Sequence, residues 1–125
     1  MTSVGGGEDR PPDPTTPHAG SLPHVMQREE GDAWVVSVVG AFDLNSAPVL
    51  EAALETGAVT HARVVVDAVG LTFADSTVLN LLLRFSRMTV LRVARPASAL
   101  ARVLELTGAD TVLDVRPTLE DALGL

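Results

Sequence analysis

The sequence predicts a single α/β domain in which strands alternate with helices and neighbouring strands are largely parallel. Compact runs of β-branched residues end at Gly, Asp or Pro, which is typical of buried strands. The segments between these runs carry apolar residues at helical spacing. Alternation of the two element types favours parallel strands joined by right-handed crossovers. The chain has 125 residues, 46% of them hydrophobic, which is enough for one core and too short for two ordinary domains.

Residues 1–24 are predicted to be a disordered tail rich in Pro and Gly. They contain five of the eight prolines, four of the ten glycines and few large apolar residues. Burial cannot offset the entropy that such a composition would lose on ordering. The segment Gly5–Gly7 is not a phosphate-binding loop, because no strand precedes it and no Lys follows it. The folded domain is therefore expected to cover residues 25–125.

A strand pair and a helix open the predicted domain. Trp34–Val39 is a β-branched run that ends beside Gly40, and Val25–Arg28 is a short partner strand across the intervening turn. The helix begins at Asn45–Pro48, where capping side chains precede a Pro in the first turn. Its apolar residues recur at helical spacing, at Val49, Leu50, Ala53 and Leu54. Gly57 is predicted to end it.

The middle of the chain predicts a buried strand that leads through a loop into an apolar helix. Val64–Val66 is continuously apolar, which indicates a strand buried on both faces, and Asp67 ends it. A loop with Gly70 then reaches three small polar residues, Asp75–Thr77, that open a helix running to about Arg87. This helix is apolar around most of its girth, which fits either a position inside the core or a face exposed for docking a partner.

Four further elements complete the predicted domain. They are a strand at Thr89–Ala94 stopped by Pro96, a helix at Ala97–Thr107 ended by Gly108, a short strand at Val112–Val115 and a terminal helix at Thr118–Leu123. Thr118 followed by Asp121 is typical of a helix-capping pair.

The charge and composition exclude several classes of function. The net charge is −7, and all nine basic residues are Arg, with no cluster that could bind nucleic acid. The absence of Cys excludes disulfides, thiol catalysis and Cys-ligated zinc. No apolar run approaches the ~20 residues that span a bilayer, and the N-terminus lacks the pattern of a signal peptide. A soluble cytoplasmic protein that binds a protein partner is expected.

An enzyme or a small-molecule binder is the class that the sequence supports least. The three histidines, His18, His24 and His61, are poorly placed for a catalytic triad or a zinc site, and each is predicted to be a solvated surface residue. Ser76 does not lie in a G-x-S-x-G nucleophile motif. No catalytic residue, metal site or cofactor is predicted.

Two interpretations of Ser76 remain open on pattern alone. Ser76 can be a plain helix cap, or Asp75 alone can be the cap while Ser76 and Thr77 project outward at a helix end that favours negative charge. A second polar cluster contains Asp43 and Asn45, and it is either a turn with a cap or one rim of the same surface. Both clusters follow the carboxyl ends of predicted parallel strands, where binding sites of α/β sheets tend to lie.

Four segments of the chain match the motifs of one family, in order and at plausible spacing. They are Gly40–Leu44 with the Pro-initiated helix after it, Val64–Ser76, Arg95–Gly108 and Thr118–Leu123. On these residues the chain resembles the STAS domain, the fold of bacterial anti-sigma factor antagonists. The resemblance covers about residues 25–125. It implies an α/β STAS fold with a mostly parallel sheet of four to five strands and helices packed mainly on one face.

The resemblance also implies a function and a set of site residues. In antagonists of this family, the Ser directly after the motif Asp is phosphorylated by a serine kinase that is also the anti-sigma factor, and here that position is Ser76. The unphosphorylated antagonist binds the anti-sigma factor and frees the sigma factor. Phosphorylation breaks the complex, and a PP2C-type phosphatase restores it. The resemblance leaves undecided whether the domain forms a homodimer. The implied partner-binding residues are Asp43, Asn45, Asp75, Ser76, Thr77 and Val78.

The chain departs from the usual family motif, Asp-Ser-Ser-Gly-Leu-Gly, just after Ser76. Thr77 keeps a hydroxyl, whereas Val78 and Asn80 replace the two glycines. Glycines at a helix start allow close approach by a partner. The alternative function is therefore a STAS scaffold or adaptor that binds its partner without a phosphorylation switch.

Overall fold

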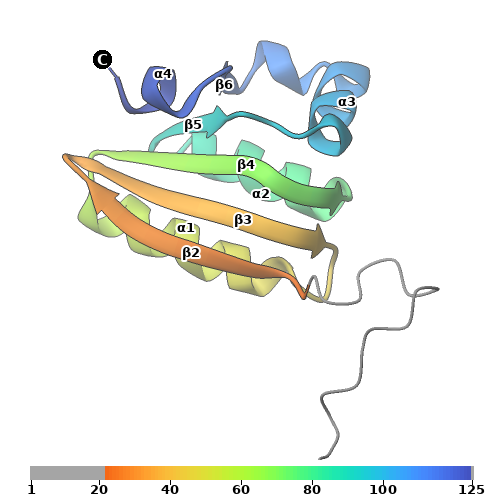
Figure 1. Cartoon of the computed structure of the whole chain (residues 1–125), viewed down its shortest axis with the longest axis horizontal. Helices are drawn as coiled ribbons and strands as arrows, with labels where there is room; N and C mark the ends of the chain where they lie inside the picture. Colours follow the sequence, from red (N-terminus) through yellow and green to blue (C-terminus); the bar gives the residue numbers. More distant parts are fainter. Residues whose placement is uncertain (1–21, 125) are drawn as a thin grey trace, which may run out of the picture.

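The sheet of the domain has five strands, and it matches the predicted mostly parallel arrangement. The computed structural model describes residues 22–124. The strands are His24–Glu30 (β2), Ala33–Phe42 (β3), Arg63–Ala74 (β4), Val90–Ala94 (β5) and Asp114–Arg116 (β6). They lie side by side in the order β2-β3-β4-β5-β6, and only the β2–β3 pair is antiparallel (Figure 1).

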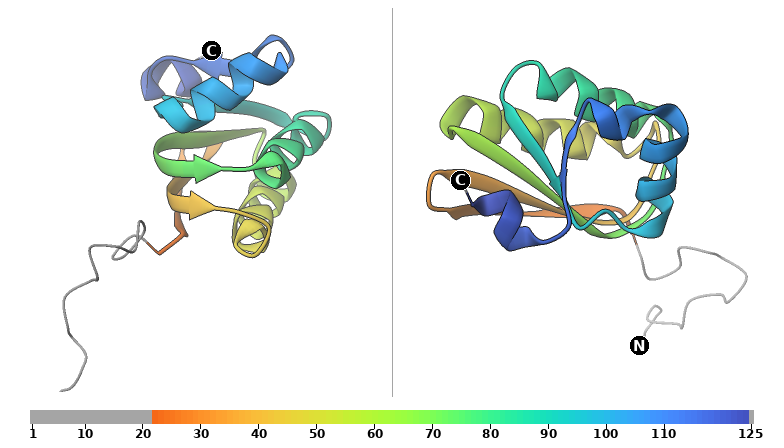
Figure 2. Two further views of the ribbon diagram at one scale, coloured as in Figure 1. Left: turned by 90° about the vertical axis from the view of Figure 1, so that its right-hand side faces the viewer. Right: turned by 90° about the horizontal axis from the view of Figure 1, so that it is seen from above.

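Three helices cover one face of this sheet and a short fourth helix covers part of the other. The helices are Ala47–Thr60 (α1), Ser76–Ser86 (α2), Ser98–Thr107 (α3) and Leu119–Leu123 (α4), with a 3-10 turn at Ala109–Thr111 (Figure 2). The main core lies under the first three, and its helical members include Leu50, Leu54, Leu82, Phe85, Leu100 and Leu104. A smaller core lies under α4, where Ala122 packs on Val35 and Val65. The prediction of helices mainly on one face is confirmed.

Helix α4 is held to the sheet by three arginines. Their guanidinium groups donate to its carbonyl oxygens: Arg63 to Leu123 at 3.0 Å, Arg92 to Ala122 at 2.9 Å and Arg116 to Asp121 at 3.0 Å. At the other end of the helix, the Thr118 hydroxyl accepts the Asp121 amide at 3.0 Å, which confirms the predicted capping pair.

Strand β4 is longer than the sequence predicts, and its extension carries the site. The predicted loop after Asp67 is strand as far as Ala74, and it pairs with β3 through two register shifts. Gly70 lies in this extension, where an added Cβ would be 3.1 Å from the Val38 carbonyl oxygen. A glycine that looked like a loop signal instead lets two strands approach closely. The prediction of a loop at this position is wrong for that reason.

Two other boundaries also differ from the prediction. Helix α1 continues past Gly57 to Thr60, because Gly57 makes room for Trp34: an added Cβ would be 2.6 Å from the Trp34 ring. The last strand begins at Asp114, because the 3-10 turn and the buried Leu113 occupy the preceding residues. Gly108, in contrast, ends α3 as predicted, in a left-handed conformation with φ of 76°.

The predicted tail lies outside the described residues except for its last three. Of these, His24 already belongs to β2, so the sheet begins one residue before the predicted start of the domain.

Candidate functional site

The two polar clusters singled out in the sequence meet at one edge of the sheet. Strands β3 and β4 end together, because Phe42 pairs with Ala74 in parallel register. The segment after β3 leads into α1 and the segment after β4 leads into α2. Asp43 and Asp75 therefore follow neighbouring strand ends, at the edge where parallel sheets usually carry their binding sites.

Asp75 is the cap of α2, and Ser76 is the first residue of that helix. The Asp75 backbone is extended, and its carboxylate Oδ1 accepts the Thr77 amide at 2.9 Å. Ser76 is exposed, and its hydroxyl makes no hydrogen bond with another described residue. Of the two interpretations, the one in which Asp75 alone caps the helix agrees with the structure. The Ser76 hydroxyl is therefore not needed to hold the helix start.

Asp43 organises the turn on the neighbouring strand end. Its carboxylate Oδ1 accepts the amides of Asn45 at 2.9 Å and Ser46 at 3.2 Å, while its own amide donates to the Ser46 hydroxyl at 2.9 Å. The Ser46 amide is the main cause that lowers the pKa of the Asp43 carboxyl below its ordinary value. Asp43 therefore places an exposed, ionised carboxylate at this edge.

The start of α1 is built differently from the predicted cap. Ser46 occupies the cap position, but its side chain forms no capping bond to the helix, because it takes part in the turn with Asp43. The Pro in the first turn, Pro48, is where the sequence predicts it.

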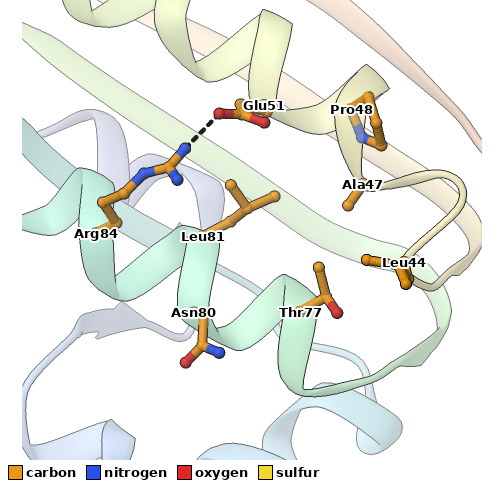
Figure 3. Close-up of a pocket in the computed structure, with 8 residues that line it drawn as sticks. All are labelled: Leu44, Ala47, Pro48, Glu51, Thr77, Asn80, Leu81 and Arg84. Atoms are coloured by element: carbon orange, nitrogen blue, oxygen red, sulfur yellow. Dashed lines mark hydrogen bonds and ion pairs between the residues drawn. The ribbon is translucent and has the colours of Figure 1, made fainter.

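An open groove of about 340 Å³ runs between α1 and α2, and Thr77, the residue after Ser76, is part of its lining. Figure 3 shows its residues: Leu44, Ala47, Pro48 and Glu51 from one side, and Thr77, Asn80, Leu81 and Arg84 from the other. Glu51 and Arg84 form an ion pair of 2.5 Å across it. Leu44 lies at the other end of the groove, close to Thr77, and its side chain is 70% exposed. Apolar side chains of Leu44, Ala47 and Pro48 therefore gather at one end of the groove, and the Glu51–Arg84 ion pair lies at the other.

Five of the six predicted partner-binding residues lie at this edge with exposed or half-exposed side chains. They are Asp43, Asn45, Asp75, Ser76 and Thr77. Val78 differs: it is 1% exposed and packs in the main core. Its side chain lies in the interior instead of on the binding surface, because Val78 belongs to the apolar face with which the amphipathic helix α2 packs on the sheet.

The groove residues Leu44, Glu51 and Arg84 are not predicted by the sequence. Leu44 carries a weak signal, because it is a large apolar residue between polar neighbours in a turn. Glu51 and Arg84 carry none, because they are 33 residues apart and meet only when α1 packs beside α2.

His61 is not the solvated surface residue that the sequence predicts. Its side chain is 12% exposed, and its Nε2 lies 2.9 Å from the Glu29 carboxylate. Its ring packs against Trp34 with 5.1 Å between centroids, at the end of the sheet away from Ser76. Within residues 22–124, no group of His, Asp and Glu is arranged to hold a metal ion. In the same part of the chain, no helix has the length and apolar character needed to cross a membrane.

Comparison with known protein families identifies the family of this domain. A family model described as "Mlab, STAS domain" matches residues 25–117. The chain belongs to the STAS domain family. The match includes the strand ends, the capped helix start and both walls of the groove, so the site lies within the part shared with the family. Comparison with curated protein sequences finds no significant match.

Solved structures support the same assignment. An anti-sigma factor antagonist from Mycobacterium paratuberculosis is 29% identical, with a TM-score of 0.74 over 81% of this chain and 91% of the other. The anti-sigma factor antagonist SpoIIAA in its unphosphorylated form is 17% identical, with a TM-score of 0.66 over 79% and 92%. The Bacillus cell fate determinant SpoIIAA in its phosphorylated form is 17% identical, with a TM-score of 0.62 over 79% and 96%. This STAS domain therefore has the fold of solved anti-sigma factor antagonists.

Proposed function

We propose that this STAS domain is an anti-sigma factor antagonist that binds an anti-sigma factor with serine kinase activity and is released when Ser76 is phosphorylated. The observation that carries the proposal is the position of Ser76. It is exposed, it is the first residue of α2, and its neighbour Asp75 makes the helix cap in its place. The proposed activity is binding of a protein partner, with no chemistry performed by the domain itself.

The local structure is suited to carrying a phosphate without unfolding. The helix-capping bond runs from the Thr77 amide to Asp75, so a modified Ser76 breaks no bond that holds α2. The first turn of a helix favours negative charge because its amides point toward the modifying group. No acidic residue lies in the first turn of α2 itself, and the adjacent carboxylate is that of the cap, Asp75.

The same phosphate would oppose a partner that packs against the bare hydroxyl. It adds about −1.5 to −2 charges at neutral pH. The edge already carries the carboxylates of Asp43 and Asp75, so a partner surface shaped for this edge would face a concentrated negative charge. A loss of about 3 kcal/mol would weaken the complex roughly a hundredfold, enough to switch it. A PP2C-type phosphatase would reverse the change.

The solved structures give this proposal indirect support. SpoIIAA, which shares the fold, has been solved in unphosphorylated and phosphorylated forms. A domain of this shape is thus compatible with both states.

The second candidate function is a STAS adaptor that uses the same edge without a switch. Asn80 favours it, because this exposed residue lines the groove where the usual family motif has a glycine. An adaptor would bind its partner through the groove whether or not Ser76 carried a phosphate.

Phosphorylation and binding measured together test the proposal. The protein is incubated with the serine-kinase anti-sigma factors of the source genome and ATP, and the phosphate is mapped by mass spectrometry. Ser76→Ala is expected to abolish modification, whereas the matched control Thr77→Ala is expected to retain it. In titration calorimetry, Ser76→Asp should weaken binding of the anti-sigma factor about a hundredfold. Binding that survives Ser76→Asp, with no modification of Ser76, would instead establish the adaptor function.

A further inference from the structure

Three short polar contacts join the far end of strand β2 to the end of helix α1. The Thr60 hydroxyl lies 2.6 Å from the Thr56 carbonyl oxygen and 2.7 Å from Nδ1 of His61. Nε2 of the same ring lies 2.9 Å from the Glu29 carboxylate. We call these four residues the His61 cluster. It lies at the end of the sheet where β3 begins, whereas Ser76 follows the other end of β4 (Figure 1).

The three contacts need three protons, and the protonation of His61 decides whether three are present. The Thr56 carbonyl and the ionised Glu29 carboxylate only accept, so each must receive a proton from its neighbour. The contact between the Thr60 hydroxyl and Nδ1 needs the third proton. The hydroxyl supplies one proton, a neutral imidazole supplies one and an imidazolium supplies two. All three contacts are therefore hydrogen bonds when His61 is protonated, and a neutral ring leaves one of them without a proton.

Glu29 is the charged group that contacts the ring. On the same strand, Arg28 and Glu30 pair with each other at 2.8 Å, and the alternation of a strand turns both of them to the opposite face. On β4, Arg63 pairs with Asp32 at 3.1 Å and also donates to a carbonyl of α4. The last turn of α1 carries no charged side chain. The proton of the ring is thus shared with one carboxylate.

The members of the cluster differ in their freedom to move. The His61 side chain is 12% exposed, and its ring packs on Trp34 with 5.1 Å between centroids. Trp34 in turn donates from Nε1 to Gln27 at 3.1 Å. Thr60 is held within α1, directly before the ring. Glu29, in contrast, is 65% exposed, so it is the member that can turn away into water.

From this proton count we infer that the His61 cluster is a pH-sensitive link between edge strand β2 and helix α1. At lower pH, the imidazolium donates to both Glu29 and Thr60 and holds the end of β2 against the helix. His61 is the C-cap of α1, and the C-terminal end of a helix favours a cation. At higher pH, the attachment of Glu29 weakens, and the end of the β2–β3 pair opens more often. The inference does not depend on the proposed function.

Both arrangements open to a neutral ring weaken the attachment of Glu29. If the remaining proton is on Nδ1 and points to Thr60, the Nε2 lone pair faces the carboxylate and repels it. If the proton is on Nε2, the bond to Glu29 survives but loses the charge assistance of the imidazolium, which makes such bonds roughly twice as strong as neutral ones. The link is therefore strongest at the lower end of the pH range in which histidine titrates.

Amide hydrogen exchange of the full chain, followed by NMR, tests the link. Protection factors of residues 29–34 are measured at about pH 5.5 and about pH 8, on either side of the ordinary histidine range. Each factor divides the intrinsic exchange rate at that pH by the measured rate, so the general effect of pH on exchange cancels. We expect protection at the higher pH to be about fivefold lower, as for the loss of one hydrogen bond. Wild-type protection that is equal at both pH values overturns the inference.

Two variants assign the effect to the His61 cluster. His61→Gln removes the titrating ring and is expected to make the protection of residues 29–34 independent of pH. The matched control His24→Gln, at the exposed other end of β2, is expected to keep the wild-type difference. Glu29→Gln introduces an amide that can donate to a neutral ring, so the pH difference should shrink there too. Thermal melts followed by circular dichroism verify that the variants fold.

The fluorescence of Trp34, the one tryptophan of the chain, reports titration of the ring in the same samples. In the wild type, emission and protection are expected to change over the same pH range. An emission change without a change in protection would mean that the ring titrates while Glu29 stays attached, which overturns the inference. A pH difference in protection that persists in both His61→Gln and Glu29→Gln overturns it as well.

Discussion

Arg95 forms a two-pronged ion pair with the buried carboxylate of Asp67. Its Nε donates to Oδ1 at 3.1 Å and its Nη2 to Oδ2 at 2.6 Å, while Asp67 is only 4% exposed. Asp67 is also the main cause that raises the pKa of the Arg95 guanidinium. Arg95 makes this contact with φ of 49°, the one non-glycine residue with positive φ among residues 22–124. The pair thus ties the end of β5 to β4 at a cost in backbone strain.

Removing Arg95 is expected to destabilise the domain strongly. Arg95→Ala leaves the Asp67 carboxylate buried without its cation and is expected to lower the free energy of unfolding by about 3 kcal/mol. Arg95→Gly loses the same ion pair but relieves the backbone strain, so it should be about 1 kcal/mol more stable than Arg95→Ala. Urea denaturation followed by Trp34 fluorescence measures both. Equal stability of the two variants would contradict the assigned strain.

Asp114 is expected to make the stability of the folded domain depend on pH in the acidic range. Its hydrogen bond from Arg116 is the main cause that lowers the pKa of the Asp114 carboxyl below its ordinary value. A lowered pKa in the folded state means stabilisation that is present above the unfolded pKa and is lost as the pH falls through the folded pKa. The stability difference between wild type and Asp114→Asn should therefore shrink as the pH falls below about 4. Urea midpoints measured at a series of pH values check this. A difference that stays constant with pH would contradict it.

Gly57 and Gly108 are expected to respond to alanine for different reasons. Gly57→Ala would place a Cβ 2.6 Å from the Trp34 ring, and such overpacking is expected to cost about 1–3 kcal/mol and to shift the Trp34 emission. Gly108→Ala meets no atom within 4 Å but must hold φ of 76°, which costs about 1 kcal/mol and leaves the emission unchanged. Denaturation and fluorescence spectra of both variants separate packing from backbone conformation.

These two glycines also explain which parts of the fold could be predicted from the sequence. At Gly108, the glycine is needed only for the left-handed conformation of that residue, so the local sequence is enough to predict the end of α3. At Gly57 and Gly70 the same residue type serves contacts with Trp34 and Val38, which lie far away in the sequence. Element type was predictable from periodicity, whereas the end of α1 and the extension of β4 depended on packing that no local pattern contains.

The candidate site also contains features that could be predicted from the sequence and features that could not. The Asp75 cap joins residues two positions apart, so the sequence could predict it. The groove could not be predicted, because its ion pair joins Glu51 and Arg84 from two helices. Val78 was misplaced because its neighbours in the motif are surface residues, while the helical period turns it into the core.

The division of roles between Asp75 and Ser76 gives the last prediction. Asp75→Ala removes the acceptor of the Thr77 amide and is expected to destabilise the domain by about 1 kcal/mol. Ser76→Ala removes an exposed hydroxyl with no described partner and should change stability by less than about 0.5 kcal/mol. Urea denaturation measures both variants. A large loss for Ser76→Ala would mean that the hydroxyl is part of the helix cap. In that case the proposed phosphorylation would act by loosening α2, whereas a neutral Ser76→Ala would leave a change in surface charge as the cause of the proposed switching.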